Sequence, residues 1–399
     1  MIDRTHARLF GAMLTFGLLI LIGGPAAEAA APSAAYQAFG LETASWFPPQ
    51  RISDSFADVD SDAPALAVID GGEVHLVWEE GDELYHSYGS GSSWTGPVPV
   101  SGTGNGQQPA LASGPDIVHL VYVKDGDIFH AVWDGSWSPS QQVSATTTPS
   151  DAPDLAVASD GSVHLVATER PVTGDPPLYY GESSDGATWP SYVPILGVYG
   201  DQASIDVTDT ATETIQIAYR AYLLEGGHDI HTIRREEESW SAPQAITNAP
   251  EYYPTGPELV LDSDKPHVTW RETISATRRV QYAQGPTWTP AITISQGGAG
   301  ITLPALGLGP QGGIHAAWGD GVSPPFRLLH TRSTDPANSA SWQQPELVVI
   351  DDSLSFDEVI LVGSENGTVH AAWVEGDTGE IWYARWPNYP VFLPLALRN

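Results

Sequence analysis

Three arginines in the middle of the chain could hold an anion. Arg220 and Arg271 directly follow the aromatic residues Tyr219 and Trp270 at the end of short apolar runs, and Arg170 follows a comparable run. A guanidinium group binds a carboxylate or a sulfate through two parallel hydrogen bonds. We therefore predict that these arginines form a clamp for an anionic group or a sugar.

Carboxylates and tyrosines accompany these arginines. The candidate ligand-binding residues are Asp151, Glu169, Asp201, Tyr252, Tyr253 and Glu272. Two carboxylates with a tyrosine could carry out glycoside hydrolysis if the carboxyl groups lie about 5–9 Å apart, and the same residues suit plain sugar binding. Salt-bridged charges on the rim of the molecule, without a ligand, are the alternative interpretation.

An internal repeat indicates which elements position these residues. The pattern Val-His-Leu-Val-Trp at 74–78 recurs with variations, and its second residue stands at positions 75, 119, 164, 216, 267, 315 and 370. A strand precedes each copy, a third strand follows it, and a Ser/Thr-Trp pair opens a fourth strand in most copies. Four short strands in a unit of about 50 residues are typical of a β-propeller blade.

The repeats predict an all-β fold, a seven-bladed β-propeller with four antiparallel strands per blade over residues 44–388. The seventh copy ends near Arg385 without a fourth strand, whereas the segment around Trp46 resembles the fourth strand around Trp137. We expect 44–53 to be the outer strand of the last blade, because closing the ring removes exposed sheet edges. Proline supports this order, since it is concentrated in the first and fourth strands, which are the edges of a blade.

One turn resembles a known family. The segment Ser183-Ser184-Asp185-Gly186-Ala187-Thr188-Trp189 is similar to the Asp-box, Ser-x-Asp-x-Gly-x-Thr-Trp, of sialidase-like (BNR-type) propellers, with one residue missing. In that family the box is a structural turn on the face opposite the active site, so the resemblance implies a fold. Family sialidases also carry an Arg-Ile-Pro motif, whereas Arg51-Ile52-Ser53 falls in the expected outer strand, and a catalytic arginine triad built on it is not expected.

Function is expected where blades differ from one another, on loops over a rigid scaffold. The loops between second and third strands are longer in blades three to six, at 170–177, 220–229, 271–279 and 319–327. The main prediction is a non-enzymatic, monomeric propeller that binds a glycan or a surface protein through the loop face over blades three to five. The alternatives are a sialidase-like glycoside hydrolase that uses the three arginines and the nearby carboxylates, and a scaffolding role in the cell envelope.

No cofactor or metal is expected. The six repeated histidines belong to six blades, too far apart to ligate one ion through bonds of about 2 Å, and buried hydrogen bonding explains them better. The run Asp58, Asp60 and Asp62 resembles the start of a calcium loop, but the glycine and distal glutamate of that motif are missing, and a solvated turn is the alternative. The chain has no cysteine, which excludes disulfides and thiolate sites.

Charge and the two ends of the sequence indicate export. The formal net charge of −33 disfavours nucleic acid as a partner. Residues 1–29 combine a basic start, an apolar stretch and a small-residue cleavage site, which predicts a signal peptide followed by a linker over 30–43. Residues 389–399 form an apolar tail, for which surface sorting and packing on the ring are both open. We expect a secreted or cell-surface protein of a bacterial envelope, without a transmembrane helix in the mature chain.

Overall fold

A computed structural model of the chain describes residues 46–53, 61–114, 116–208, 213–223, 226–236, 238–309, 312–353, 355–364, 366–376 and 378–386. All of them belong to one compact unit, Glu42–Asn399. The expected signal peptide, linker and C-terminal tail lie outside the described residues, as do Asp58 and Asp60 of the calcium-loop candidate. Within this described part, no helix is long and apolar enough to cross a membrane.

The described residues form antiparallel sheets and no α-helix. Four sheets consist of consecutive strands: β2 (Ser61–Val68), β3 (Val74–Glu80), β4 (Glu83–Gly89) and β5 (Val98–Pro99); β6 (Gly106–Ser113), β7 (Val118–Lys124), β8 (Asp127–Trp133) and β9 (Gln141–Gln142); β18 (Thr255–Asp262), β19 (Lys265–Ile274), β20 (Thr277–Gln284) and β21 (Ile292–Thr293); β22 (Ala305–Leu308), β23 (Ile314–Asp320), β24 (Phe326–Ser333) and β25 (Glu346–Asp351). A fifth combines β26 (Phe356–Gly363), β27 (Val369–Glu375) and β28 (Glu380–Trp386) with β1 (Gln50–Arg51). Two short 3₁₀ turns are η1 (Pro250–Tyr252) and η3 (Ser339–Ser341).

The remaining sheet has eight strands and arises because one strand is unusually long. Its strands are β10 (Ser150–Val157), β11 (Val163–Glu169), β12 (Pro177–Ser183), β13 (Ser191–Val207), β14 (Thr214–Tyr222), β15 (His228–Glu236), β16 (Ser239–Trp240) and β17 (Gln244–Ala245). The first part of β13 pairs with β12, and its last part, from Gly200 to Val207, pairs with β14. Where a loop separates one repeat from the next elsewhere, β13 passes from one to the other without a break.

Burial follows the position of a strand in its sheet. The second strands, β3, β7, β11, β14, β19, β23 and β27, carry the histidine pattern of the sequence and are buried along most of their length. A strand covered on both faces has a nearly continuous apolar sequence, as in Val74-His75-Leu76-Val77-Trp78. The prediction of an all-β fold built from four-stranded antiparallel sheets is confirmed.

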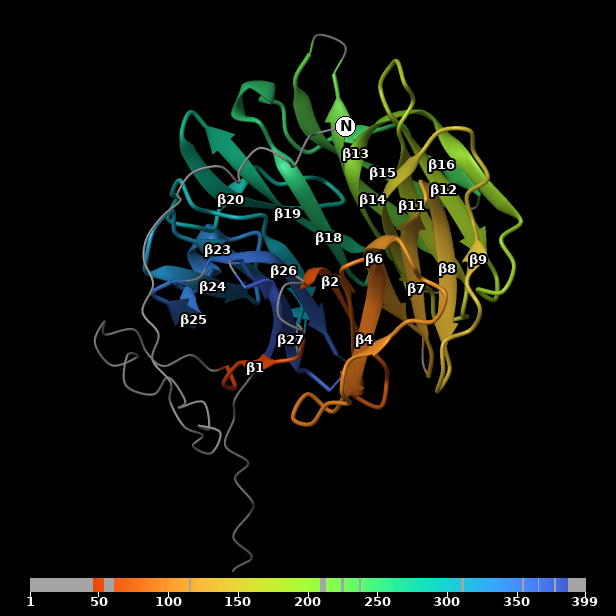
Figure 1. Cartoon of the computed structure of the whole chain (residues 1–399). Coiled ribbons are helices and arrows are strands. Elements are labelled where there is room, and N and C mark those ends of the chain that lie inside the picture. The colour runs from red at the N-terminus through yellow and green to blue at the C-terminus, as the bar shows by residue number, and fades with distance from the viewer. Residues whose placement is uncertain are drawn as a thin grey trace, which may run out of the picture. The chain divides into compact units, whose positions relative to one another are not determined.

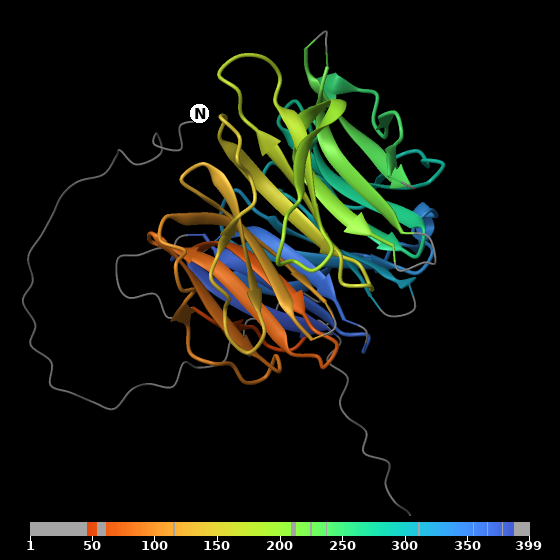
Figure 2. The same cartoon turned by 90° about the vertical axis from the view of Figure 1, so that its right-hand side faces the viewer.

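The first strands of the sheets contact one another in a cyclic order. Strand β2 contacts β6, β6 contacts β10, β10 contacts β13, β13 contacts β18, β18 contacts β22, β22 contacts β26, and β26 contacts β2. Figures 1 and 2 show the sheets succeeding one another in chain order, and the last ones, in blue, lie beside the first, in orange. The N-terminal β1 forms the edge of the last sheet, where Gln50 pairs with Tyr383 and the Ser53 hydroxyl donates to Glu380 at 2.6 Å.

A bulge near the start of the first strands links neighbouring sheets. Its central residue has a positive φ, between 47° and 60°, at Ala63, Gln108, Ala152, Gln202, Gly256 and Glu358. Three of these residues accept a hydrogen bond from the backbone N–H of the next bulge: Glu358 from Ala63 at 2.7 Å, Gln108 from Ala152 at 2.8 Å and Gln202 from Gly256 at 3.0 Å. A bulge redirects the side chains beside it, here those of Asp151 and Asp201.

Buried aromatic clusters join the sheets at the opposite end of the second strands. The repeated histidine bonds to a His or Tyr of the third strand at 2.5 to 3.1 Å in the pairs His75–His86, His119–His130, His164–Tyr180, His267–Tyr282, His315–His330 and His370–Tyr383. A tryptophan of the neighbouring repeat packs edge-on against the His or Tyr, with ring centroids 4.8 to 5.2 Å apart, in the pairs Trp137–His86, Trp189–His130, Trp240–Tyr180, Trp342–Tyr282, Trp46–His330 and Trp94–Tyr383. These histidines therefore serve the packing of sheet against sheet.

Candidate functional site

Four of the nine candidate residues meet in one charged cluster at the loop end of the eight-stranded sheet. Arg220 binds Asp201 through two parallel hydrogen bonds, from Nε to Oδ1 at 2.7 Å and from Nη2 to Oδ2 at 2.8 Å. Arg170 binds Asp151 through Nε at 2.9 Å and reaches Asp201 through Nη1 at 3.3 Å. The hydroxyl of Tyr222 donates to Asp201 at 3.0 Å. We call these five residues the Asp201 cluster.

The register of the strands explains why these residues meet. Asp201 lies opposite Arg220 in the pairing of β13 with β14, at the same place where Asp151 lies opposite Thr168 in the preceding repeat. Arg170 comes two residues after Thr168, and side chains two apart on a strand point to the same face. Both acids precede a bulge in a first strand, whereas Arg170 directly follows the second strand β11 and Arg220 lies on the second strand β14.

The charges of the cluster reinforce one another. The side chain of Asp201 is only 4% exposed and that of Arg220 is 19% exposed. Burial opposes the charge of Asp201, but the hydrogen bonds and positive charges of Arg220 and Arg170 outweigh it and hold the pKa of Asp201 below its ordinary value. For Arg170 and Arg220, burial is likewise outweighed by the acids, and their pKa values are raised. Asp201 is thus an ionised anchor for two guanidinium groups and not a proton donor.

Tyr222 and His228 belong to the site although the sequence did not single them out. They pair across the β14–β15 hairpin, with ring centroids 4.7 Å apart in an edge-on contact. Burial and the charge of Arg220 lower the pKa of His228, against the opposite effect of Asp201, so the imidazole is neutral at pH 7. Burial and Asp201 raise the pKa of Tyr222. The signal for Tyr222 was its spacing of two from Arg220, which places both on one face of a strand.

Arg271 is the arginine of the site that forms no ion pair among the described residues. It lies opposite Thr255 in the next sheet, at the position that Arg220 takes in the eight-stranded sheet. Its Nε is buried without a hydrogen-bond partner, and no ion pair involves it among the described residues. Burial, with the charge of Arg278, lowers its pKa. The hydroxyl of Thr255 donates to Gln202, the neighbour of Asp201, at 2.8 Å, which joins the two parts of the site.

Glu169 and Glu272 do not join the arginines. Glu169 is buried and accepts hydrogen bonds from four hydroxyl groups, those of Thr146, Thr148, Ser150 and Tyr192. Glu272 is also buried and accepts a hydrogen bond from Gln281 Nε2 at 2.7 Å. Each glutamate directly adjoins an arginine on its strand and therefore points to the other face of the sheet. These two glutamates are structural hydrogen-bond acceptors.

The tyrosine pair lies beside the site on a short turn. Tyr252 ends the 3₁₀ turn η1, which contacts β19, the strand of Arg271. Both rings are exposed, that of Tyr253 to 63%. Exposed aromatic rings on a loop face are available for stacking against a ligand.

Two further carboxylates lie deeper along the first strands, where the sequence did not predict them. Asp154 on β10 and Glu258 on β18 occupy the position directly after the bulge, where β13 between them has Ser204. Burial raises the pKa of Asp154 to about 6, against hydrogen bonds from the N–H groups of Ile205 and Leu155. The side chain of Glu258 is exposed, yet the surrounding protein partly desolvates its carboxyl group, and this desolvation, with the charge of Asp154, raises its pKa to about 8. The sequence signal for these two carboxylates was an acidic residue at a position where four other repeats have an apolar one, namely Ala65, Ala110, Ala305 and Ile360.

The Asp-box-like segment forms a turn at the other end of its sheet. Asp185 Oδ1 accepts hydrogen bonds from the N–H groups of Ala187 at 2.9 Å and Thr188 at 3.0 Å, and Trp189 packs on His130. The segment closes a turn and contributes no group to the Asp201 cluster. Among the residues that the structure describes, no group of three or more His, Asp or Glu side chains is arranged to hold a metal ion.

Comparisons of structure reveal the fold. No protein-family model and no curated protein sequence matches the chain. An ulvan lyase of polysaccharide lyase family PL25, bound to -[GlcA(1-4)Rha3S]-, is similar with a TM-score of 0.61 and 12% identity over 84% of this chain and 95% of the lyase. The polysaccharide lyase Uly1 gives 0.52 and 12% over 85% and 93%. A protein of unknown function from Dyadobacter fermentans gives 0.52 and 11% over 84% and 97%. The chain has a β-propeller fold.

These comparisons correct the main functional prediction. A non-enzymatic binder of glycan or protein was expected, but two of these three similar structures are named as polysaccharide lyases. That expectation is wrong, and its physical basis was weak, because the sequence could not show that Tyr222 and His228 adjoin the arginines. Identities of 11 to 12% establish the fold alone. The resemblance to sialidase-like propellers in particular stays a prediction.

Proposed function

We propose that this chain is an exported, monomeric propeller enzyme of seven blades that cleaves an acidic polysaccharide at the Asp201 cluster by β-elimination. The eight-stranded sheet would contain blades three and four, and β1 would close the last blade. Support for the blade count comes from the seven sequence repeats and the cyclic contacts of the first strands. Support for export comes from the sequence pattern of residues 1–29.

β-Elimination from a uronic acid residue makes three demands on an enzyme. A base removes the proton from C5, the electron pair of that C–H bond forms a C4–C5 double bond, and the bond from C4 to the leaving oxygen breaks. A cation must stabilise the charge that develops on the neighbouring carboxylate, and an acid must protonate the leaving oxygen. The reaction consumes no water and needs no redox partner.

The residues at the Asp201 cluster suit these three demands. Arg271 is a guanidinium without a partner and would bind the uronate carboxylate. His228 is neutral at pH 7 and would remove the proton from C5. Tyr222 carries a phenolic proton beside it, which Asp201 accepts in the structure; on binding, this hydroxyl would turn to the leaving oxygen and protonate it. Asp151 would orient Arg170, and Tyr252 and Tyr253 would stack on neighbouring sugar units.

The observation that carries this proposal is the contact of Tyr222 with His228 at the end of β14, next to a fixed pair of arginines and one free arginine. At the position of Tyr222, the repeats around His75, His119 and His315 have Gly81, Asp125 and Gly321. The similarity to two polysaccharide lyases supports the same reaction class, and one of them is named with a glucuronate-containing ligand.

The direct test is incubation of the mature protein with uronate polysaccharides, including ulvan, alginate, pectate and hyaluronan. We expect a rise in ultraviolet absorbance, because the new double bond is conjugated with the carboxylate. The variants Tyr222→Phe and His228→Ala should abolish this rise, whereas Tyr199→Phe, which removes the hydroxyl of an exposed tyrosine of β13, should preserve it. Absence of an absorbing product on every substrate would rule out the eliminating reaction on these polymers.

Glycoside hydrolysis is the second candidate, and the paired acids Asp154 and Glu258 favour it. A carboxyl group that stays protonated near neutral pH can act as general acid beside an ionised partner, which is the arrangement that hydrolysis uses. With pKa values of about 8 and about 6, Glu258 would be the acid and Asp154 the base or nucleophile. Release of reducing ends without an ultraviolet-absorbing product, lost in Glu258→Gln, would select this reaction over elimination.

A further inference from the structure

One contact between neighbouring sheets lacks the aromatic ring that fills the others. Six tryptophans that open a fourth strand pack on a His or Tyr of the neighbouring third strand. The seventh, Trp288, faces β15, where the corresponding residue is Thr232. The repeated histidine of β14 is also replaced, by Gln216, which hydrogen bonds to Thr232. Two small or flexible polar side chains thus stand where every other repeat has two rings.

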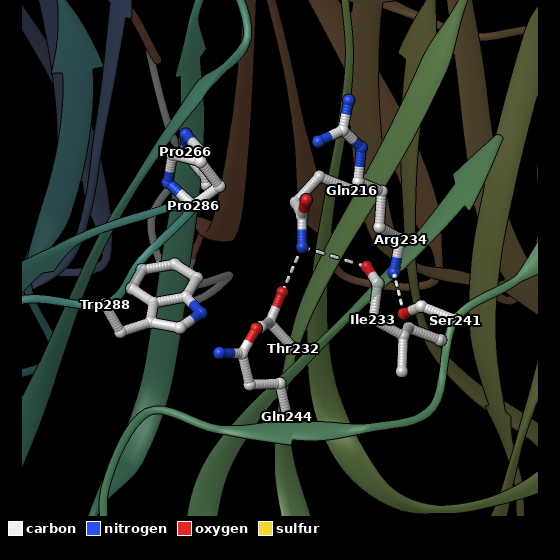
Figure 3. A pocket seen from close by; sticks show the side chains of 9 residues that line it. All are labelled: Gln216, Thr232, Ile233, Arg234, Ser241, Gln244, Pro266, Pro286 and Trp288. Carbon is white, nitrogen blue, oxygen red and sulfur yellow. Dashed lines mark hydrogen bonds between the residues drawn. The ribbon is translucent and has the colours of Figure 1, made fainter.

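The missing ring leaves a cavity of about 200 Å³ between β14–β15 and the next sheet. Figure 3 shows the indole of Trp288 on one side of it and Gln216, Thr232 and Gln244 on the other. The other lining residues are Ile233, Arg234, Ser241, Pro266 and Pro286. Ser241, Gln244 and Pro286 are exposed, so the cavity can be reached from solvent.

The lining combines an aromatic face with uncharged hydrogen-bonding groups. Gln216 Nε2 donates to Ile233 O at 3.0 Å, which leaves its side-chain oxygen as an acceptor without a partner. The side-chain amide of Gln244 makes no hydrogen bond in the described structure, and Arg234 Nε is buried without a partner. The charge of Arg234 is balanced by Glu236 at 2.6 Å, so the cavity presents no net charge.

We propose that this cavity binds one neutral pyranose unit. The C–H face of a pyranose would pack on the indole of Trp288, and its hydroxyl groups would bond to Gln216, Gln244 and Arg234 Nε. Pockets of about 300–1,000 Å³ take drug-sized ligands, so a cavity of this volume suits a single monosaccharide. Gln216 precedes Arg220 by four residues on β14, or about 13 Å at about 3.3 Å per residue. The sugar site is therefore separate from the Asp201 cluster and would hold a polymer or a cell-surface glycan independently of cleavage.

The test is saturation-transfer NMR of the whole mature protein with galactose, glucose, mannose, fucose, rhamnose and xylose. We expect transfer to at least one of these sugars, and a loss of affinity of tenfold or more in Trp288→Ala. Thr232→Tyr is the sharper variant, because it restores the ring that Tyr180, Tyr282 and Tyr383 provide elsewhere and should fill the cavity, and its melting temperature checks that the fold is kept.

The outcomes separate this site from the proposed enzyme. Tyr222→Phe, the variant expected to be inactive, should bind the same sugar with unchanged affinity, whatever the result of the cleavage assay. Transfer to none of the six sugars, or transfer that Thr232→Tyr leaves unchanged, would overturn the proposal.

Discussion

The two ends of the second strands have different roles. The residues at one end recur from repeat to repeat, whereas those at the other end do not. At one end, a buried histidine with a ring partner and a neighbouring tryptophan recurs from sheet to sheet. At the other end, an ion-pair cluster forms around Asp201, beside the bulges of β10 and β13. Residues that recur in every repeat stabilise the packing of sheets, whereas residues that break the pattern are free to carry chemistry. Changes at the two ends should therefore affect different measurements.

Removal of the imidazole at the loop end should have the largest effect on activity. In His228→Ala, we expect kcat on a cleaved uronate polysaccharide to fall about 10²- to 10⁴-fold, the usual contribution of one acid–base group. The melting temperature should change little, because His228 is only partly buried. Steady-state kinetics and calorimetry on the same preparation measure both. A large fall in melting temperature with unchanged kcat would assign His228 to structure.

Low pH should lower the stability of the protein through the buried histidines at the opposite end of the second strands. Burial lowers the pKa of His119 and His267 to about 4 and that of His130 to about 3, whereas the unfolded chain takes up these protons near pH 6.5. Between these limits the unfolded state binds more protons, so the free energy of unfolding falls as pH falls. Each histidine contributes up to about 1.4 kcal/mol per pH unit, and the contribution is constant below its folded pKa. Melting temperatures at pH 7, 6, 5 and 4 test this.

A matched variant identifies the groups responsible for acid sensitivity. His119→Gln, which copies the residue that the chain has at Gln216, should reduce the pH slope of stability by about one proton. A melting temperature that is flat between pH 7 and 4.5 would contradict the assignment of these histidines as buried and neutral.

Removal of one arginine should destabilise the loop end because it leaves a buried charge. In Arg220→Met, Asp201 loses its bidentate partner and keeps only Arg170 and Tyr222. We expect a loss of about 3 kcal/mol in the free energy of unfolding, as is usual for one partner of a buried pair. The control is Arg327→Met, whose ion pair with Asp320 is exposed and should be worth less than about 1 kcal/mol. Equal losses in denaturant titrations would show that Asp201 is solvated.

Filling the cavity beside Trp288 should have the smallest effect and the opposite sign. Thr232→Tyr supplies the ring found at six equivalent contacts, so it should raise the free energy of unfolding by about 1 kcal/mol. Thr269→Tyr is the contrasting variant, because Thr269 is fully buried and its hydroxyl donates to Gln281 O, so overpacking should destabilise the protein. Destabilisation by Thr232→Tyr would show that the neighbouring sheet cannot accept the repeated arrangement.

The sequence predicted the fold best where the same packing constraint acts on every repeat. A buried second strand must alternate in the same way in every sheet, so His75 and its six counterparts reveal strand order without any structure. The continuity of β13 was not predictable, because two strands can merge even when turn-forming residues lie between them in the sequence. The sequence also brought Asp151, Arg170, Asp201 and Arg220 to one face, but it could not decide between an anion clamp and mutual ion pairing, which depends on side-chain conformation.

His228 and the cavity were missed for related reasons. His228 lies in a hairpin whose length differs between repeats, so no alignment with another repeat identifies its position. The replacement at Gln216 was visible in the repeat, but a cavity appears only when Thr232 on the next strand is considered with Trp288 of the neighbouring sheet. Such combinations require the pairing of strands, which the hydrophobic pattern alone does not fix.

The unbroken strand β13 has a consequence for how the protein can be cut. A protease needs an exposed, locally unfolded segment, and no connecting loop interrupts Ser191–Val207 between the part paired with β12 and the part paired with β14. Limited digestion should therefore leave residues 191–207 uncut, whereas cleavage is expected in the exposed hairpin around Val172. Asp201, to which both Arg170 and Arg220 bind, lies on this uncut strand, so a nicked protein should keep the acid that joins the two guanidinium groups.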